Sequence, residues 1–358
     1  MIPASDIDAT ASAAALGQET KSPVTSAVTV ENLTPSDSNP TPSFQTIGSK
    51  GIVLTKSRRA KISWTGDEQL GLQSLTTPVM KNQYTQCMRG IINEMEQDLA
   101  LEAAGGALLL GNVVGTAGTA PFLTDTKALT LARKMLSDNG ALADTSSAML
   151  ECVLNTEAGM NLRNLDKLQK ANESGDNTLL RQGVLGNLFG FKVRESNGFL
   201  PHTKGSGTGY LVNGNFKAGA REITIDTGSG TIERGDIVKF GSDNTQYIVA
   251  EKVETGGTIL KIAGELKADV ADNAAVAIGS GYVASAAFRH GSVVLATRVP
   301  ALPTYGDNAL DRTIITDPLS GISFEVAVWG GSYQNTITVA AVWGVKNIKG
   351  EHSVAIIG

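Results

Sequence analysis

The longest periodic pattern in the chain predicts a helix over residues 77–105, and this helix sets the scale of the fold. Thr77 is a suitable N-cap, Pro78 fits the first turn, and Gly105 closes the pattern. Roughly 27 residues at 1.5 Å per residue make a rod about 40 Å long. Apolar side chains recur at three-to-four spacing at Val79, Tyr84, Cys87, Met88, Ile91, Ile92, Met95 and Leu99. The pattern therefore predicts one long amphipathic helix.

The chain before this helix is different. Residues 1–24 are small, polar and Ala-rich, which predicts an N-terminal arm with a short helix. Residues 25–76 alternate between apolar and polar side chains on both sides of a Pro/Ser/Asn-rich tip at 34–43, which predicts an extended hairpin. An isolated hairpin is only marginally stable in water. We therefore expect it to lie across another subunit and to bury apolar side chains there, namely Ile52, Leu54 and Trp64.

Shorter elements follow the long helix. A helix is expected over 126–139 with Gly140 at its C-terminal cap, then a strand over 148–154 and a helix led by Asn155. Residues 182–195 form an apolar run that is punctuated by three glycines, Gly183, Gly186 and Gly190. Glycine permits turns and close approaches that other residues do not. This run predicts a tight connection that leads into a buried strand.

Residues 214–282 change character again. Apolar and polar residues alternate between Gly, Asp and Asn turns, so about five or six short strands fit and no helical period does. This predicts a small β-barrel or β-sandwich domain inserted into the chain. Inside it, Arg234-Gly235-Asp236 spells an adhesion tripeptide, but its setting favours a turn that enters a strand over 237–240. After the insertion, residues 284–298 are apolar and helical or strand-like, and strands return over 313–357.

Composition limits the possible functions. A chain of 358 residues is long enough for two or three domains. Charged residues make up 18% of the chain, below the usual quarter, and there are 40 glycines. This composition is typical of a protein whose surface is covered by neighbouring subunits, and also of ordinary β-rich domains. The net charge of −5 argues against electrostatic binding of nucleic acid by the chain as a whole.

The two cysteines and the apolar runs bear on location. Cys87 and Cys152 have no metal-type spacing, and each lies in an apolar pattern, so we expect buried free thiols in a reducing cytoplasm. No apolar run approaches the length that spans a bilayer. The N-terminus lacks the basic flank and apolar stretch of a secretory signal. We therefore expect a protein that is cytosolic when it is made.

The motifs of common enzymes are missing from the sequence. His202, His290 and His352 lie far apart, outside any ligand spacing, so no metal site is expected. The sequence contains neither GxSxG nor GxxxxGK[ST]. The glycines of residues 205–209 lack dinucleotide-binding spacing, which favours a flexible loop over a nucleotide cradle. We expect no catalytic residue and no cofactor, and hence no enzyme.

One basic cluster has several interpretations. It consists of Lys56, Arg58, Arg59 and Lys61 in the second arm of the predicted hairpin. It is either a solvated strand face, a contact with an acidic helix face of a neighbouring subunit, or a nucleic-acid contact. The last is disfavoured because no aromatic side chains are interleaved with the charges. The acidic face in question is Glu94, Glu96 and Asp98 of the long helix.

Three stretches in their order carry a family resemblance. They are LRQGVLG at 180–186 with its continuation to Val193, GDIVKF at 235–240, and SGISFEV at 320–326 followed by VWGVKNIKGEHSVAIIG at 342–358. Together they resemble the coat proteins of tailed bacteriophages, most closely the short-tailed branch with an extra β domain. The resemblance runs from about residue 25 to the C-terminus. It implies an α+β chain with the Hong Kong phage capsid fold.

The resemblance also implies a domain plan. It runs as an N-terminal arm at 1–24, an extended loop at 25–76, a peripheral domain at 77–150 with its spine helix at 77–105, an axial domain at 151–213, an inserted β domain at 214–282, an axial return at 283–312 and C-terminal peripheral strands at 313–358. Gly183, Gly186 and Gly190 then become hinge or turn positions that let the axial domain tilt. No large propeptide and no lysine–asparagine cross-link are expected.

The implied function is assembly. Such a coat protein forms pentamers and hexamers of an icosahedral procapsid and mature shell, together with a scaffolding and a portal protein. The shell encloses double-stranded DNA without reading its sequence, is assembled in the bacterial cytoplasm and becomes part of the virion. Two alternatives remain: a phage tail or decoration protein, which would also be β-rich and glycine-rich, and a cytosolic enzyme, which would need convergent titratable groups.

Overall fold

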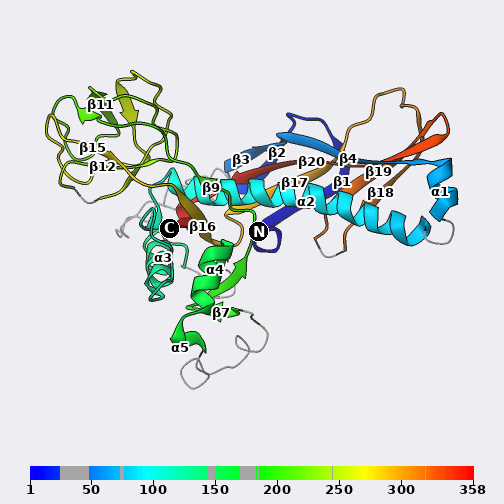
Figure 1. Ribbon diagram of the computed structural model, residues 1–358, viewed down its shortest axis with the longest axis horizontal. Coiled ribbons are helices and arrows are strands. Elements are labelled where there is room, and N and C mark those ends of the chain that lie inside the picture. The colour runs from blue at the N-terminus through cyan, green and yellow to red at the C-terminus, as the bar shows by residue number, and fades with distance from the viewer. Residues whose placement is uncertain are drawn as a thin grey trace, which may run out of the picture. The chain divides into compact units, whose positions relative to one another are not determined.

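The computed structural model describes residues 1–24, 48–72, 76–142, 150–169, 183, 185–243, 245–318 and 320–358. The chain is of the α+β class, with mostly antiparallel strands and a few helices (Figure 1). It divides into two compact units. Unit 1 comprises Met1–Asp6, Arg89–Val294 and Lys349–Gly358, and unit 2 comprises Ile7–Met88 and Leu295–Ile348.

Unit 2 is built on a six-stranded sheet. Its strand order is β1 (Asp6–Ala14), β17 (Val293–Pro300), β20 (Gln334–Asn347), β19 (Ser323–Gly331) and β18 (Ala309–Thr316), with β4 (Lys56–Thr65) paired to β20. Central strand β20 is buried on both faces over its middle part, with Val339, Ala341 and Trp343 on one face and Thr338 and Val342 on the other. Strands were predicted over 313–357, and β19 and β20 within this range confirm this. The N-terminal prediction of a short helix is wrong, because residues 6–14 form a strand that pairs with β17.

A two-stranded ladder lies at the start of unit 2. Strand β2 (Glu19–Val24) pairs antiparallel with β3 (Gly48–Val53), and Glu19 faces Val53 at one end while Val24 faces Gly48 at the other. The predicted tip at 34–43 lies outside the described residues. The second arm of the predicted hairpin is split between two sheets, which was not expected. Strand β3 pairs with β2, whereas β4 pairs with β20 of the large sheet.

Helix α1 (Gly66–Leu72) and helix α2 (Thr76–Leu108) follow β4. Helix α2 confirms the predicted long helix and begins one residue before Thr77, so Thr77 and Pro78 lie in its first turn. Its amphipathic character is confined to the half in unit 1. There Ile91, Met95, Leu99, Ala103 and Ala107 are buried at a spacing of four, whereas no described residue from 77 to 90 is buried.

Unit 1 is built on a seven-stranded mixed sheet. Its order is β5 (Val113–Gly115), β21 (Ser353–Ile357), β16 (Tyr282–Arg289), β6 (Leu150–Leu154), β8 (Phe191–Glu195) and β7 (Asn187–Leu188), and β9 (Pro201–His202) also pairs with β16. Strands β21 and β5 pair in parallel, as do β6 and β8. Every residue of β6 and β21 is buried, which explains why both strands are apolar except for Glu151 of β6 and Ser353 of β21.

Helices α3 (Lys127–Asp138), α4 (Thr156–Arg163) and α5 (Asp166–Gln169) accompany this sheet. Both predicted helix ends are confirmed: Gly140 follows α3 with φ +77°, and the Asn155 carboxamide accepts a hydrogen bond of 2.6 Å from the Ala158 amide at the start of α4. Two short 3-10 turns lie at Ile2–Ala4 and Gly350–His352. Leu129, Leu136, Leu154, Phe191 and Ile356 are among the residues of the shared core.

Residues 208–278 form two small sheets around a core of their own. One sheet is β10 (Leu211–Val212), β11 (Glu222–Asp226) and β14 (Ile259–Lys261), and the other is β13 (Tyr247–Ile248), β12 (Ile237–Phe240) and β15 (Val276–Ile278). Buried side chains from both sheets, including Ile223, Val238 and Leu260, make one hydrophobic cluster. We call this segment the β domain; the structure places its core between Tyr210 and Val276.

Candidate subunit-contact surfaces

The basic cluster lies on strand β4, which is paired to β20 along its whole length. Side chains alternate along a strand, so Arg59 and Lys61 share one face and Trp64 takes the other. Arg59 and Lys61 are exposed, and Trp64 is buried. Lys56 and Arg58 also make interactions within the chain. The exposed face of β4 is therefore basic, and its role in subunit contact stays a prediction.

The three apolar side chains that were expected to face a neighbouring subunit are buried in their own unit. Ile52 and Leu54 are completely inaccessible, and Trp64 is 6% exposed. The chain folds back over them, because the Leu54 amide donates to the Gln18 carbonyl and the Gly17 amide donates to the Leu54 carbonyl, both at 2.9 Å. This corrects the expectation that they bury their surface against another copy. Their packing contribution is intramolecular.

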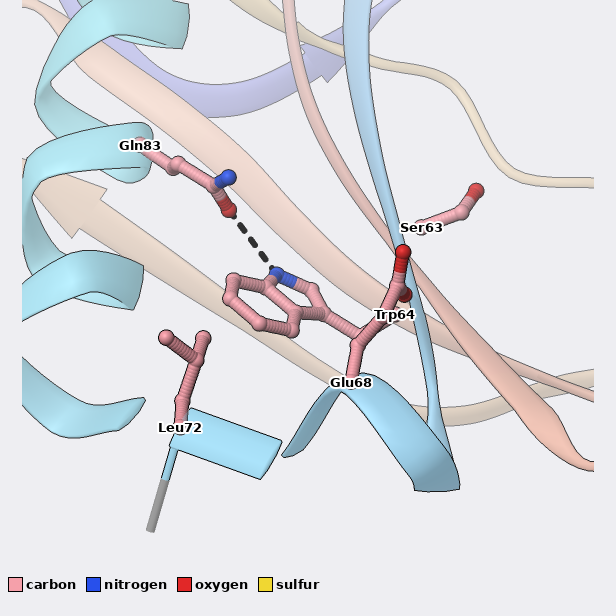
Figure 2. Close-up of a pocket in the computed structure, with 5 residues that line it drawn as sticks. All are labelled: Ser63, Trp64, Glu68, Leu72 and Gln83. Carbon is pink, nitrogen blue, oxygen red and sulfur yellow. Dashed lines mark hydrogen bonds between the residues drawn. The ribbon is translucent and has the colours of Figure 1, made fainter. Parts of the chain in front are cut away.

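Trp64 borders the pocket shown in Figure 2, a hollow of about 400 Å³ lined by Ser63, Trp64, Glu68, Leu72 and Gln83. The indole N–H donates a hydrogen bond of 2.8 Å to Gln83 Oε1 of α2. Glu68 accepts from the amide and the hydroxyl of Thr65 at 2.9 Å, and these hydrogen bonds hold the pKa of that carboxyl below its usual range. The pocket thus ties β4 to α1 and α2, and its polar groups already have partners within the chain.

The acidic residues of α2 have separate environments. Glu96 is bound inside unit 1, where its two oxygens lie 3.4 Å from the Met1 ammonium and 3.1 Å from the Ser196 hydroxyl. Burial lowers the pKa of the Met1 ammonium, and Glu96 partly opposes that shift. Glu94 and Asp98 are half-buried and have interactions within the chain. A contact of this face with β4 of a neighbouring subunit stays a prediction.

The glycine-punctuated stretch forms a β-hairpin. Strands β7 and β8 pair with Leu188 opposite Phe191, and the two residues between them, Phe189 and Gly190, have φ of 51° and 81°. Two residues with positive φ in a two-residue loop define the turn type that matches the natural twist of a hairpin. The predicted tight turn is confirmed, and the strand that follows is buried on one face only, where Phe191 and Val193 lie, while Lys192 and Glu195 are exposed.

The three glycines are restricted for different reasons. Gly183 and Gly186 have φ of 67° and 61°, and an added Cβ would meet no atom within 4 Å at either position, so only the backbone conformation disfavours a side chain there. At Gly190 an added Cβ would lie 1.9 Å from a guanidinium nitrogen of Arg133, which donates to the Phe189 carbonyl. The hinge role of these glycines stays a prediction.

A polar cluster that the sequence did not indicate lies where the β domain meets the rest of unit 1. Asp236 is buried, and its carboxylate accepts hydrogen bonds from the Glu233 amide at 2.8 Å and the Gly205 amide at 3.0 Å. His202 Nε2 lies 2.8 Å from the same carboxylate. The hydroxyl of Tyr282 donates to the Gly235 carbonyl at 2.9 Å, and burial raises the pKa of that phenol.

This cluster explains two sequence features. The tripeptide at 234–236 is the predicted turn, with Gly235 at φ +94° and β12 starting at Ile237 as expected. The run at 205–209 is no free loop, because Gly205 and Gly207 approach the Thr231 carbonyl so closely that an added Cβ would lie within 2.2 Å and 3.0 Å of it. The sequence held one signal of this cluster, namely an acidic residue, Asp236, in a predicted turn directly before an apolar strand.

Two other kinds of site are absent from the part of the chain that the structure describes. No group of three or more His, Cys, Asp or Glu side chains among the described residues is arranged to hold a metal ion. No helix in the described part is long and apolar enough to cross a membrane. Cys152 is fully buried, as predicted, and burial raises the pKa of its thiol to about 12; Cys87 is only half-buried.

Comparison with known proteins gives structural matches only. No protein-family model matches the chain, and no characterised protein matches it in sequence. The capsid of Ralstonia phage GP4 matches with a TM-score of 0.47 and 10% identity, over 99% of this chain and 86% of that one. The mature capsid of bacteriophage PhiM1 matches with 0.45 and 10%, over 96% and 84%. A structure of Mycobacterium phage Che8 matches with 0.44 and 13%, over 95% and 84%.

Proposed function

We propose that this chain is the major capsid protein of a bacteriophage and assembles with copies of itself into a closed shell. The observation that carries the proposal is the order of elements along the chain. The β2–β3 ladder is followed by the long helix α2, then by the mixed sheet, the β domain and strands that return to both sheets. The sequence resemblance implies the same order for the tailed-phage coat proteins.

The finer parts of the proposal concern partners and location. The subunits form pentamers and hexamers of an icosahedral procapsid that matures around double-stranded DNA, with a scaffolding and a portal protein as assembly partners. Assembly takes place in the cytoplasm of the bacterial host, and the protein has a structural role without catalysis. The net charge of −5 fits a shell that encloses DNA without binding it tightly.

The physical basis is the sum of many moderate contacts. Closed symmetry repeats every contact around a ring, so weak contacts combine into a stable shell. The extended loop predicted over 25–76 belongs in such a contact, and Gly183, Gly186 and Gly190 supply turn positions at which unit 1 adapts to pentamers and hexamers. Replacement of Gly186 by Val is expected to impair shell geometry through its positive φ. Gly186→Val shells of normal yield, size and expansion would remove the hinge from the proposal.

The test is expression of the chain with the scaffold gene of its own phage, followed by sedimentation velocity and negative-stain electron microscopy. We expect closed shells on the order of several hundred ångströms across, which closed symmetry builds from many copies of one chain. Monomers alone would overturn the proposal. Tubes or small rings would instead favour the alternative of a tail or decoration protein.

A deletion variant sharpens this test. Removal of residues 27–73 would take away β3 and β4 together with buried Trp64, so it would unfold unit 2 for reasons unrelated to assembly. Removal of residues 27–45 with a short Gly/Ser replacement keeps β2 and β3. We expect this shorter deletion to leave a folded monomer with an unchanged circular dichroism spectrum and to abolish shells. A deletion variant that still forms shells would exclude the arm from the contact.

A further inference from the structure

Two edges of the unit 2 sheet differ in chemistry. The strands β4, β20, β19 and β18 lie side by side, and within the described residues β4 pairs only with β20 and β18 pairs only with β19. Each of these two strands therefore has one row of backbone amides and carbonyls directed away from the sheet. An open edge of this kind is a template for a strand from another chain.

Strand β18 is an uncovered apolar edge. Leu310 is 69% exposed, Ile314 47% and Ile315 43%. Successive residues of a strand point to opposite faces, so Ile314 and Ile315 show that neither face of β18 is covered. Soluble proteins normally protect an edge strand with charges, proline or a bulge. In β18 the charged residues, Asp311 and Arg312, lie in the first half, so the second half, from Thr313 to Thr316, has no charge and no proline and favours association. The only irregularity in β18 lies near its start, between Ala309 and Asp311.

The two edges carry opposite charge. Strand β4 contains four basic residues and no acidic one. Lys56 and Arg58 make interactions within the chain, so Arg59 and Lys61, which are exposed, carry the charge argument. The segment 305–325, which contains β18, has four carboxylates against the single guanidinium of Arg312, a formal charge of −3. Arg312 is itself held by Asp307 and Glu325 inside the unit. Two copies of β4 would repel each other, whereas β18 beside β4 brings opposite charges together.

Strand direction allows the same pairing. The pairs β18–β19, β19–β20 and β20–β4 are all antiparallel, so β4 and β18 run in opposite directions. A second copy placed beside the first without reversal of its strands would bring its β18 next to β4 in antiparallel orientation. The ladder would continue from one copy to the next. This is a head-to-tail contact, which closes into a ring when it is repeated by rotation.

We propose that β18 of one copy adds to the free edge of β4 in the next copy, so that the unit 2 sheets of neighbouring subunits are continuous. Arg59 and Lys61 of β4 face the acidic segment around Asp311, and Leu310, Ile314 and Ile315 become covered by the neighbour. The occupant of both edges is a second copy of this chain. The inference rests on the proposed shell and names one of its contacts.

The first experiment reverses the charge of one edge. The variant Arg59→Glu/Lys61→Glu is expected to lower the yield of closed shells at least about tenfold, the effect of about 1.4 kcal/mol in one equilibrium, because the altered contact recurs at every subunit. Its circular dichroism and its monomer peak in gel filtration should be unchanged. The matched control is Lys127→Glu/Lys134→Glu on α3, which changes the net charge equally and should leave the yield unchanged.

A rescue variant separates repulsion at this edge from a general charge effect. Adding Asp311→Lys to Arg59→Glu restores opposite charges across the contact, and we expect shell yield to recover toward that of the unaltered chain, while each single variant assembles poorly. Asp311 suits this exchange because Asp307 and Glu325 already hold Arg312. Equal yield for single and double variants would overturn the proposed pairing.

The second experiment needs no shell. In a Cys87→Ser background, Ser57→Cys or Ser63→Cys on β4 is mixed with Thr313→Cys on β18 under mild oxidation. Disulfide-linked dimers are expected from the mixture and from neither variant alone, because the contact is head-to-tail. Dimers of a single variant with itself, or none from any mixture, would overturn the inference.

The outcomes distinguish this inference from the proposed function. If the unaltered chain forms shells and the charge-reversed variant does so equally well, this contact is wrong and the shell proposal stands. If the unaltered chain forms no shell with its scaffold, the shell proposal fails, and the cysteine mixtures still decide whether β18 and β4 pair.

Discussion

The mixed sheet and the β domain of unit 1 each have their own hydrophobic core, and both cores are made mainly from short strands. The mixed-sheet core collects residues from distant parts of the chain, from Val114 to Ile356. The β-domain core draws only on residues between Tyr210 and Val276. Strands β6 and β21 are buried on both faces, whereas β11 alternates between buried and exposed residues.

The difference shows how much of each core depends on long-range pairing. Strand β21 at the C-terminus pairs with β5 and β16, which lie about 240 and 70 residues earlier, so the mixed sheet forms only when remote segments meet. The β domain closes its own ladders within one stretch, and its entry and exit lie side by side because His202 pairs with Tyr282. We therefore expect the two cores to open independently.

The largest expected effect comes from matched truncations in the two cores. Ile356→Ala in β21 and Ile225→Ala in β11 each remove a fully buried side chain and should cost about 2–5 kcal/mol of unfolding free energy. Amide hydrogen exchange should show lost protection for the mixed sheet in the first variant and for the β domain in the second. If either variant weakens both cores equally, the two form one cooperative unit and the comparison is wrong.

The sequence predicted the β domain better than the mixed sheet for a physical reason. Alternation and turn residues are local signals, so β11, β12 and the turn at Gly235 could be expected from the sequence alone. A strand buried on both faces has no alternation, and the pattern at 284–298 therefore left helix and strand undecided, where the structure has β16 and β17. Strand β5 has only three residues and depends on β21, so no local pattern indicated it.

The candidate contact residues show the same limit. The charge and exposure of Arg59 and Lys61 follow from their place on alternate positions of β4. That Ile52, Leu54 and Trp64 are covered by their own chain depends on β20 and α2, which are far away in sequence. The turn at Asp236 could be expected from the sequence, but the contact of its carboxylate with His202 of β9 could not, because it joins two distant segments.

The next effect concerns the junction between the two cores. Asp236→Ala removes both carboxylate oxygens, so the Gly205 and Glu233 amides, which both donate to Oδ2, lose their partner. We expect a loss of about 1–3 kcal/mol, seen as faster amide exchange at Gly205 and in β12. Glu254→Gln, which removes an equal charge from an exposed position, is the control. Unchanged exchange at Gly205 would show that the junction does not depend on this carboxylate.

A smaller, pH-dependent effect should be confined to the mixed sheet. Burial raises the pKa of the Cys152 thiol in β6 from its ordinary value of 9.0 to about 12. The unfolded thiol loses its proton above pH 9 while the folded one keeps it, so stability is lost as the pH rises from 9 toward 12, by about 1 kcal/mol at pH 10. Cys152→Ala should remove this part of the alkaline loss of stability. Urea unfolding at pH 7.5 and pH 10 measures the difference, and equal pH dependence in both proteins would contradict it.

The smallest effect is expected on the surface of the β domain, where ion pairs are numerous and exposed. Lys252 lies 3.2 Å from both Glu233 and Glu254, and the hydrogen bonds to Glu254 and Glu233 raise the pKa of its ammonium. Exposed pairs gain little, because water and salt screen the charges and two side chains lose freedom. Lys252→Ala should leave the urea midpoint of the β domain unchanged at high and at low salt. A clear loss at low salt that vanishes at high salt would mean that surface charge stabilises this domain in addition to its core, a contribution that the fully buried strands of the mixed sheet do not share.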